Sequence, residues 1–100
     1  MPIQIAMDHD RIATFCEKWK VREFALFGSV LRDNFGPDSD VDVVVTLEES
    51  SGLSLRDWVK MIDELKEVFG REVDLVSSRG LRNPFRRHHI LTTRQILYAA

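Results

Sequence analysis

Apolar positions along the chain repeat with two periods, one typical of helices and one typical of strands. After Asp8, a plausible N-cap, apolar residues recur at i, i+3, i+4 and i+7, which predicts an amphipathic helix. These residues are Ile12, Phe15, Cys16 and Trp19. Positions 54–69 carry the most regular helical pattern, and Gly70 suits its C-terminal end. Its apolar face is expected to contain Leu55, Trp58, Val59, Ile62, Leu65 and Phe69.

Three strands are expected, and two of them show alternation with a period of two. The clearest runs from Ser39 to Leu47, with Val41, Val43, Val45 and Leu47 on one face and Asp40, Asp42, Val44 and Thr46 on the other. Residues 23–27 form a short buried strand that ends at Gly28. Residues 72–76 form a third, with Val73 and Leu75 on one face and Asp74 on the other. Short helical segments are expected at 30–34 and at 85–98.

The order of these elements predicts the fold class. Helices and strands alternate along 100 residues with no repeat and no linker, so we expect a single domain over 1–100. The class is α/β (α+β), with a small mixed sheet of about three strands and helices packed against it.

Composition indicates the cellular compartment of such a protein. One cysteine, Cys16, excludes an internal disulfide, and its place on the apolar helix face predicts a core residue instead of a reactive thiol. No apolar run approaches the roughly 20 residues that span a bilayer. The first residues lack the features of a secretory signal. A cytoplasmic, soluble protein without a membrane partner is therefore expected.

The charge is divided along the chain. Positions 1–78 hold all 16 acidic residues and 9 of the 14 basic ones, a net charge of −7, while the last 22 residues carry a net charge of +5. This asymmetry often marks a surface that meets an anion. The basic residues there are Arg79, Arg82, Arg86, Arg87 and Arg94, joined by His88 and His89. They could contact an acidic protein surface or phosphates, or could simply be a solvated helix face.

The paired carboxylates are the first candidate for chemistry. Asp40 and Asp42 project from one face of a strand, roughly 6.6 Å apart along the backbone, where their repulsion would weaken a sheet. Solvated acids at a strand end are one reading, and a divalent cation that removes the repulsion is the other. An EF-hand calcium loop does not fit, because Val43 stands where the turn requires glycine.

Gly28 and Ser29 supply a second candidate. They lead from a strand into a predicted helix, where unpaired backbone N–H groups and the helix dipole attract phosphate. Most Gly-Ser pairs are only turns, so the value of this pair depends on the carboxylates. A phosphate-binding turn next to two carboxylates suits a complex of a metal ion with a triphosphate.

Gly28-Ser29, ten residues and then Asp40-Val41-Asp42 resemble the GS-x10-DxD motif of the polymerase-β-type nucleotidyltransferases. The residues around the motif resemble the minimal nucleotidyltransferases of this family, which are usually paired with a HEPN-domain toxin. The resemblance extends over essentially the whole chain and implies the polymerase-β-like nucleotidyltransferase fold, with Asp74 as third carboxylate. Arg32 matches the family and could contact a phosphate or a nearby acid. Asp33 departs from the glycine found in many relatives, which puts the phosphate contacts in doubt.

The resemblance implies a mechanism and a partner. Asp40, Asp42 and Asp74 would hold two Mg²⁺ ions, Gly28 and Ser29 would bind the phosphates of ATP, and AMP would pass to a hydroxyl of the HEPN toxin. The chain would thereby act as an antitoxin. The alternatives are an inactive antitoxin that neutralises its toxin by steric cover, and nucleotidylation of a small molecule. The short basic tail does not lead us to expect direct nucleic-acid binding, whereas a homo- or hetero-oligomer is plausible for so small a domain.

Two further readings of the tail do not hold. The spacing of Arg82 and His88 is reminiscent of the R-x4-6-H nuclease motif of HEPN toxins, but Asn83-Pro84 between them would break the helix that the motif needs. His88 and His89 are adjacent, so on a helix they would face different directions and could not share a metal ion.

Overall fold

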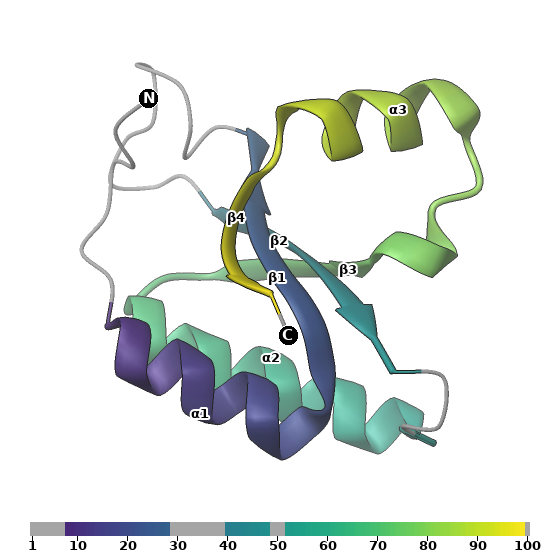
Figure 1. Ribbon diagram of the computed structural model, residues 1–100. Coiled ribbons are helices and arrows are strands. Elements are labelled where there is room, and N and C mark those ends of the chain that lie inside the picture. Colours follow the sequence, from purple (N-terminus) through teal and green to yellow (C-terminus); the bar gives the residue numbers. More distant parts are fainter. Residues whose placement is uncertain (1–7, 29–39, 49–51, 100) are drawn as a thin grey trace.

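The computed structural model describes residues 8–28, 40–48 and 52–99. These residues form three α-helices and four strands in a mixed α/β arrangement (Figure 1). In chain order the elements are α1 (His9–Trp19), β1 (Val21–Phe27), β2 (Val41–Leu47), α2 (Leu55–Phe69), β3 (Val73–Ser77), the 3-10 turn η2 (Ser78–Gly80), α3 (Pro84–Thr93) and β4 (Gln95–Ala99). Among these helices, none combines the length and the apolarity that crossing a membrane requires.

The four described strands form one sheet in the order β3-β2-β1-β4. Strand β1 runs antiparallel to both of its neighbours, β2 and β4. Strands β2 and β3 are parallel and are connected through α2, because a parallel pair needs a crossover. The carboxyl end of β1 therefore meets the amino ends of β2, β3 and β4 at one end of the sheet. The mixed sheet confirms the predicted fold class.

Helices α1 and α2 cover one face of the sheet (Figure 1), and the main core lies between them and the strands. Phe24 of β1 stands at its centre, edge-on to Phe15 of α1 at 5.9 Å and stacked with Phe69 of α2 at 6.5 Å between ring centroids. The other face carries a smaller cluster in which Ile90 of α3 packs with Ala25, Phe27 and Val44. Because both faces of the sheet are covered in this region, successive residues of β1 and β2 are apolar.

Helix ends follow the capping residues read from the sequence. The Asp8 carboxylate accepts a hydrogen bond from the Arg11 backbone N–H at 3.1 Å, which confirms it as the N-cap of α1. Ser54 and Asp57 form a reciprocal capping box at the start of α2. The hydrogen bonds from Ser54 to the Asp57 carboxylate lower the pKa of that carboxyl group. Gly70 ends α2 with a left-handed backbone, φ +67°, as predicted.

The apolar face predicted for α2 was partly wrong. Leu55 is 81% exposed and Val59 is 52% exposed, whereas Met61, which the prediction omitted, is fully buried. The buried residues of α2 are Met61, Leu65 and Phe69, spaced four apart, with Trp58, Ile62 and Val68 partly buried against the core. At 3.6 residues per turn this stripe leaves Leu55 and Val59 on the flank of the helix.

The last element was also predicted incorrectly. The helix expected over 85–98 ends at Thr93, and the residues after it form β4, a fourth strand. Arg94 has an extended backbone, and the Gln95–Ala99 segment pairs with β1. Pairing supplies partners for the backbone N–H and C=O groups on the outer side of β1, a requirement that outweighs the helical spacing of the tail. The helix predicted at 30–34 lies outside the described residues.

Two leucines of α2 offer a direct test of the burial pattern. Leu65→Ala should lower the free energy of unfolding by about 2–5 kcal/mol, because it leaves a cavity in the core. Leu55→Ala removes the same atoms from an exposed position and should change the free energy of unfolding by at most about 0.5 kcal/mol. Urea denaturation of both variants measures the difference, and equal losses would contradict the observed burial.

Candidate functional site

Two of the three predicted carboxylates are neighbours in the sheet. In the parallel pairing of β2 and β3, Val41 lies opposite Val73 and Asp42 lies opposite Asp74. Val41 and Val73 point into the main core, so both aspartates point to the opposite face. Paired strands lie about 4.8 Å apart, which brings the two side chains within reach of one ligand. Asp42 is half-buried and Asp74 is exposed.

Asp40 lies at the same end of the sheet, one residue before β2, and is exposed. A hydrogen bond of 2.9 Å from the Val41 N–H to the Glu72 carbonyl joins the starts of β2 and β3 next to it. Across the parts of the chain that the structure describes, no three His, Cys, Asp or Glu side chains are grouped closely enough to hold a metal ion. The strand register therefore brings Asp42 and Asp74 together, and a site that includes Asp40 stays a prediction.

Gly28 completes the described part of the site. Phe27, the last residue of β1, is the register partner of Asp42, so Gly28 directly follows the strand that flanks this carboxylate. Its φ of +75° is in the left-handed region that favours glycine. A Cβ atom at Gly28 would lie 2.3 Å from Oδ2 of Asp42, well inside contact distance. The missing side chain thus makes room for the Asp42 carboxylate, a role that the sequence analysis did not assign.

The remaining predicted phosphate ligands cannot be placed. Ser29 and Arg32 lie outside the described residues, so their proposed contacts with phosphate stay predictions. The sequence had assigned Gly28 to the same phosphate-binding turn. The structure instead shows Gly28 against Asp42, which links the turn directly to the carboxylates.

The chemistry of these donors fits a hard divalent cation. Mg²⁺ takes oxygen ligands, is commonly held by one or two protein carboxylates and fills its other positions with water and phosphate oxygens. Asp42 and Asp74 provide two carboxylates from adjacent strands, and Gly28 leaves the space next to Asp42 clear. A cation there would also relieve the repulsion between two like charges.

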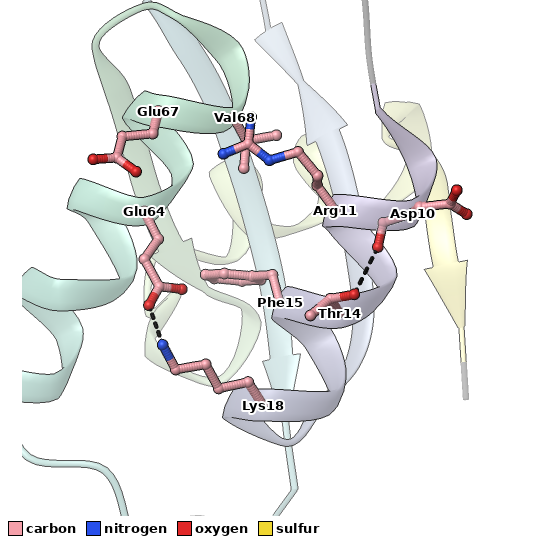
Figure 2. A pocket seen from close by; sticks show the side chains of 8 residues that line it. All are labelled: Asp10, Arg11, Thr14, Phe15, Lys18, Glu64, Glu67 and Val68. Carbon is pink, nitrogen blue, oxygen red and sulfur yellow. Dashed lines mark hydrogen bonds and ion pairs between the residues drawn. The ribbon is translucent and has the colours of Figure 1, made fainter.

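A groove between α1 and α2 is the other candidate for a site, with a volume of about 440 Å³ (Figure 2). Phe15 and Val68 contribute apolar surface, and charged side chains surround them. Lys18 forms an ion pair with Glu64, which also accepts a hydrogen bond of 2.9 Å from Nε1 of Trp19. Burial alone would raise the pKa of Glu64, but the bonds from Lys18 and Trp19 lower it on balance. The groove lies in the helical layer, across the main core from Asp42 and Asp74, and its ion pair serves to join α1 to α2.

The single cysteine is part of the core, as predicted. Cys16 is 1% exposed and packs within the main cluster. Burial, assisted by the nearby Glu17 carboxylate, raises the pKa of the Cys16 thiol to about 12. At neutral pH the group is a neutral thiol and plays no part in the site.

Comparison with known proteins identifies the family of this arrangement. Residues 11–97 match the family described as nucleotidyltransferase domain. MJ1379 of Methanocaldococcus jannaschii, inferred to be a protein adenylyltransferase, is 32% identical over 82 residues, which cover 82% of this chain and 80% of MJ1379. The structure of an inferred minimal nucleotidyltransferase superposes with a TM-score of 0.71 at 33% identity, covering 87% of this chain and 86% of that one.

A more distant structure has the same fold. It contains the tri-AMPylated HEPN toxin of Shewanella oneidensis in complex with its MNT antitoxin. The matched chain superposes with a TM-score of 0.66 at 20% identity, covering 92% of this chain and 70% of that one. At this identity the likeness concerns the fold alone.

Gly28 and Gly70 have similar left-handed backbones, but only Gly28 lies against Asp42. Alanine at each position therefore distinguishes the need for space next to Asp42 from the need for a left-handed backbone. Gly70→Ala places a Cβ where no atom lies within 4 Å, so it should cost only the left-handed strain of about 1–2 kcal/mol. Gly28→Ala adds a collision with the Asp42 carboxylate and should lose more stability than Gly70→Ala in the same urea titration. An equal loss in the two variants would contradict the close packing of Gly28 against Asp42.

The raised pKa of Cys16 predicts a protected thiol. Iodoacetamide should modify the folded protein at pH 8 far more slowly than the protein in denaturant, because only the thiolate reacts. The thiol's contribution to stability is complete below its ordinary pKa of 9.0 and is lost as the pH rises toward about 12, where the folded form also ionises. Labelling followed by mass spectrometry measures the protection, and rapid modification of the folded protein would refute it.

Proposed function

This chain belongs to the nucleotidyltransferase domain family, and from that premise we propose that it transfers AMP from ATP to a hydroxyl of a HEPN-domain toxin, and so acts as its antitoxin. The observation that carries the proposal is the register of β2 and β3, which sets Asp42 beside Asp74 and against Gly28. The relative in Methanocaldococcus jannaschii and the AMPylated toxin of Shewanella oneidensis support the choice of nucleotide and acceptor.

Each predicted residue has a defined task in this reaction. Asp40, Asp42 and Asp74 would hold Mg²⁺, for which two ions are expected. Bound there, the metal would polarise the phosphate oxygens and favour loss of the proton from the acceptor hydroxyl. Gly28 and Ser29 present backbone N–H and hydroxyl groups to the terminal phosphates, and Arg32 contributes a positive charge near them.

The transfer itself is a substitution at the α-phosphorus. The acceptor oxygen forms the new P–O bond, and the bond from the α-phosphorus to the bridging oxygen breaks. Pyrophosphate leaves with that electron pair, and the hydroxyl proton passes to solvent. Positioning of the acceptor and the triphosphate in line is the main contribution that the protein must make.

The acceptor is assigned to a partner protein because two of the three carboxylates are exposed and open to a second molecule. Helices α1 and α2 occupy one face of the sheet, and α3 packs on part of the other (Figure 1). Asp74 and Asp40 are exposed at the end of the sheet, where a side chain of a second protein can approach them. A toxin hydroxyl brought in this way would be modified and the toxin silenced.

Replacement of Asp42 tests the enzyme. With Mg²⁺, ATP and the HEPN-domain protein of the adjacent reading frame, the wild type should raise the mass of that protein by one or more AMP groups. Asp42→Asn should abolish the gain while changing the free energy of unfolding by no more than about 1 kcal/mol, since it keeps the shape and removes a repelling charge.

Asp63→Asn, on an exposed position of α2 in the opposite layer, is the matched control and should retain full activity. Chelation with EDTA should stop transfer in the wild type. Transfer that survives in Asp42→Asn or in EDTA would refute the carboxylate–metal assignment. A tight complex whose partner never gains mass would instead support the inactive antitoxin.

A further inference from the structure

Helix α3 has two sides with opposite properties. On the inner side Ile90, 2% exposed, packs with Ala25, Phe27 and Val44. On the outer side Phe85 is 85% exposed, the largest exposure among the large apolar side chains of the described residues. Phe85 and Ile90 are five positions apart, and at 3.6 residues per turn this spacing points them about 140° apart around the helix. Phe85 therefore has no part in the core.

The exposed residues around Phe85 are basic. Arg82, two residues before α3 begins, and Arg86, His88 and His89 within it are exposed, and positions 79–99 contain no acidic residue. Two other arginines serve the fold: Arg87 donates to the Ser78 carbonyl at 2.5 Å, and Nε of Arg94 donates to Glu23 at 2.8 Å. Within residues 8–28, 40–48 and 52–99, neither Arg82 nor Arg86 has a carboxylate partner.

An exposed phenylalanine flanked by unpaired arginines has the composition of an interface centre. Aromatic residues and arginine are enriched at the energetic centres of protein interfaces. Removing a phenylalanine side chain from water stabilises a complex through the hydrophobic effect. Arginine adds paired hydrogen bonds to carboxylates in a fixed geometry. We name Arg82, Phe85, Arg86, His88 and His89 the α3 surface.

We propose that the α3 surface docks the acceptor protein, which presents an apolar pocket for Phe85 within an acidic rim that pairs with Arg82 and Arg86. This inference rests on the proposed function, because it names the surface by which the acceptor is held. The charge of the surface defines the chemistry of the occupant. The α3 surface is cationic and so favours an acidic protein surface, and its apolar centre needs a pocket and not an open charged chain.

The position of α3 connects this surface to the carboxylates. Phe27, which Ile90 contacts, is the register partner of Asp42 and precedes Gly28. A helix with its side chains is about 10–12 Å across, so a protein seated on the outer side of α3 lies about one helix diameter from the sheet face that carries Asp42 and Asp74. A loop of the docked protein can cover that distance, because an extended chain spans about 3.3–3.6 Å per residue.

Single-stranded RNA is a less suitable occupant. Proteins that bind single strands combine a basic groove with several stacking aromatic residues. The α3 surface lies on one helix and the residues just before it, and Phe85 is its one Phe, Tyr or Trp side chain. The chain as a whole also carries a net charge of −2, which does not favour a polyanion.

Binding of the unmodified HEPN-domain protein of the adjacent reading frame tests the proposal by isothermal titration calorimetry. Phe85→Ala should raise Kd at least tenfold, and Arg82→Glu combined with Arg86→Glu should raise it at least tenfold and weaken its dependence on salt. Leu55→Ala, which removes an equally exposed apolar side chain from α2, and Arg56→Glu, an exposed arginine on the same helix, should leave Kd within about twofold.

The result that overturns the proposal is an unchanged Kd in both α3 variants, or no binding of the HEPN-domain protein at all. Equal toxin binding with loss of affinity for a fluorescent 20-nucleotide RNA would assign the α3 surface to RNA and would also overturn it. The same titration with Asp42→Asn separates the two claims. If α3-dependent binding persists while no AMP is transferred even by the wild type, the docking surface stands and the proposed function fails.

Discussion

Asp42 and Asp74 lie opposite each other in the parallel pairing of β2 and β3, so the sheet holds two like charges side by side. A cross-strand pair of like charges opposes pairing by a few tenths of a kcal/mol to about 1 kcal/mol. On the other face the same strands bury Val41, Val43 and Leu75, and each buried side chain of this kind contributes about 1.5–3 kcal/mol. Core packing therefore outweighs the repulsion. The carboxylates stay together because the alternate residues of the same two strands belong to the core.

Much of the fold was readable from hydrophobic periodicity, and the exceptions have physical causes. Helix α1 was predicted with its cap and all four buried residues, because Asp8 and the i, i+3, i+4, i+7 spacing act locally. Strand β4 was missed because its formation depends on the unpaired edge of β1, a partner about 70 residues earlier. The rotated face of α2 has a similar origin. Which side of α2 faces inward depends on how the helix packs on the sheet. The apolar stripe also includes Leu55 and Val59, so the sequence does not specify that the side with Met61 is buried.

The site could be predicted in part for a different reason. Alternation along β2 and β3 was enough to put Asp42 and Asp74 on the face away from the core, but only the register shows that they are opposite each other. The spatial relation of Gly28 to Asp42 was beyond sequence reasoning, since it depends on the antiparallel pairing of β1 with β2. Resemblance to a family supplied the grouping of these residues, and the structure supplies the reason why glycine is required. Ser29 belongs to the same turn by sequence and Arg32 to the helix expected at 30–34, and their contacts remain predictions.

The strand that was missed also explains how α3 can be part of a working surface. A helix held only by Ile90 would be free to tilt on the sheet. Strand β4 prevents this, because it begins directly after α3 and pairs with Ala25 and Leu26 of the strand that leads to Gly28. The half-buried ion pair between Arg94 and Glu23 makes a second connection between the end of α3 and β1. With its end fixed to the same strand that flanks Asp42, α3 is a rigid element, and groups presented on rigid elements keep their geometry relative to a reacting centre. Strand β4 thus both supplies hydrogen-bonding partners for the edge of β1 and fixes the helix that precedes it.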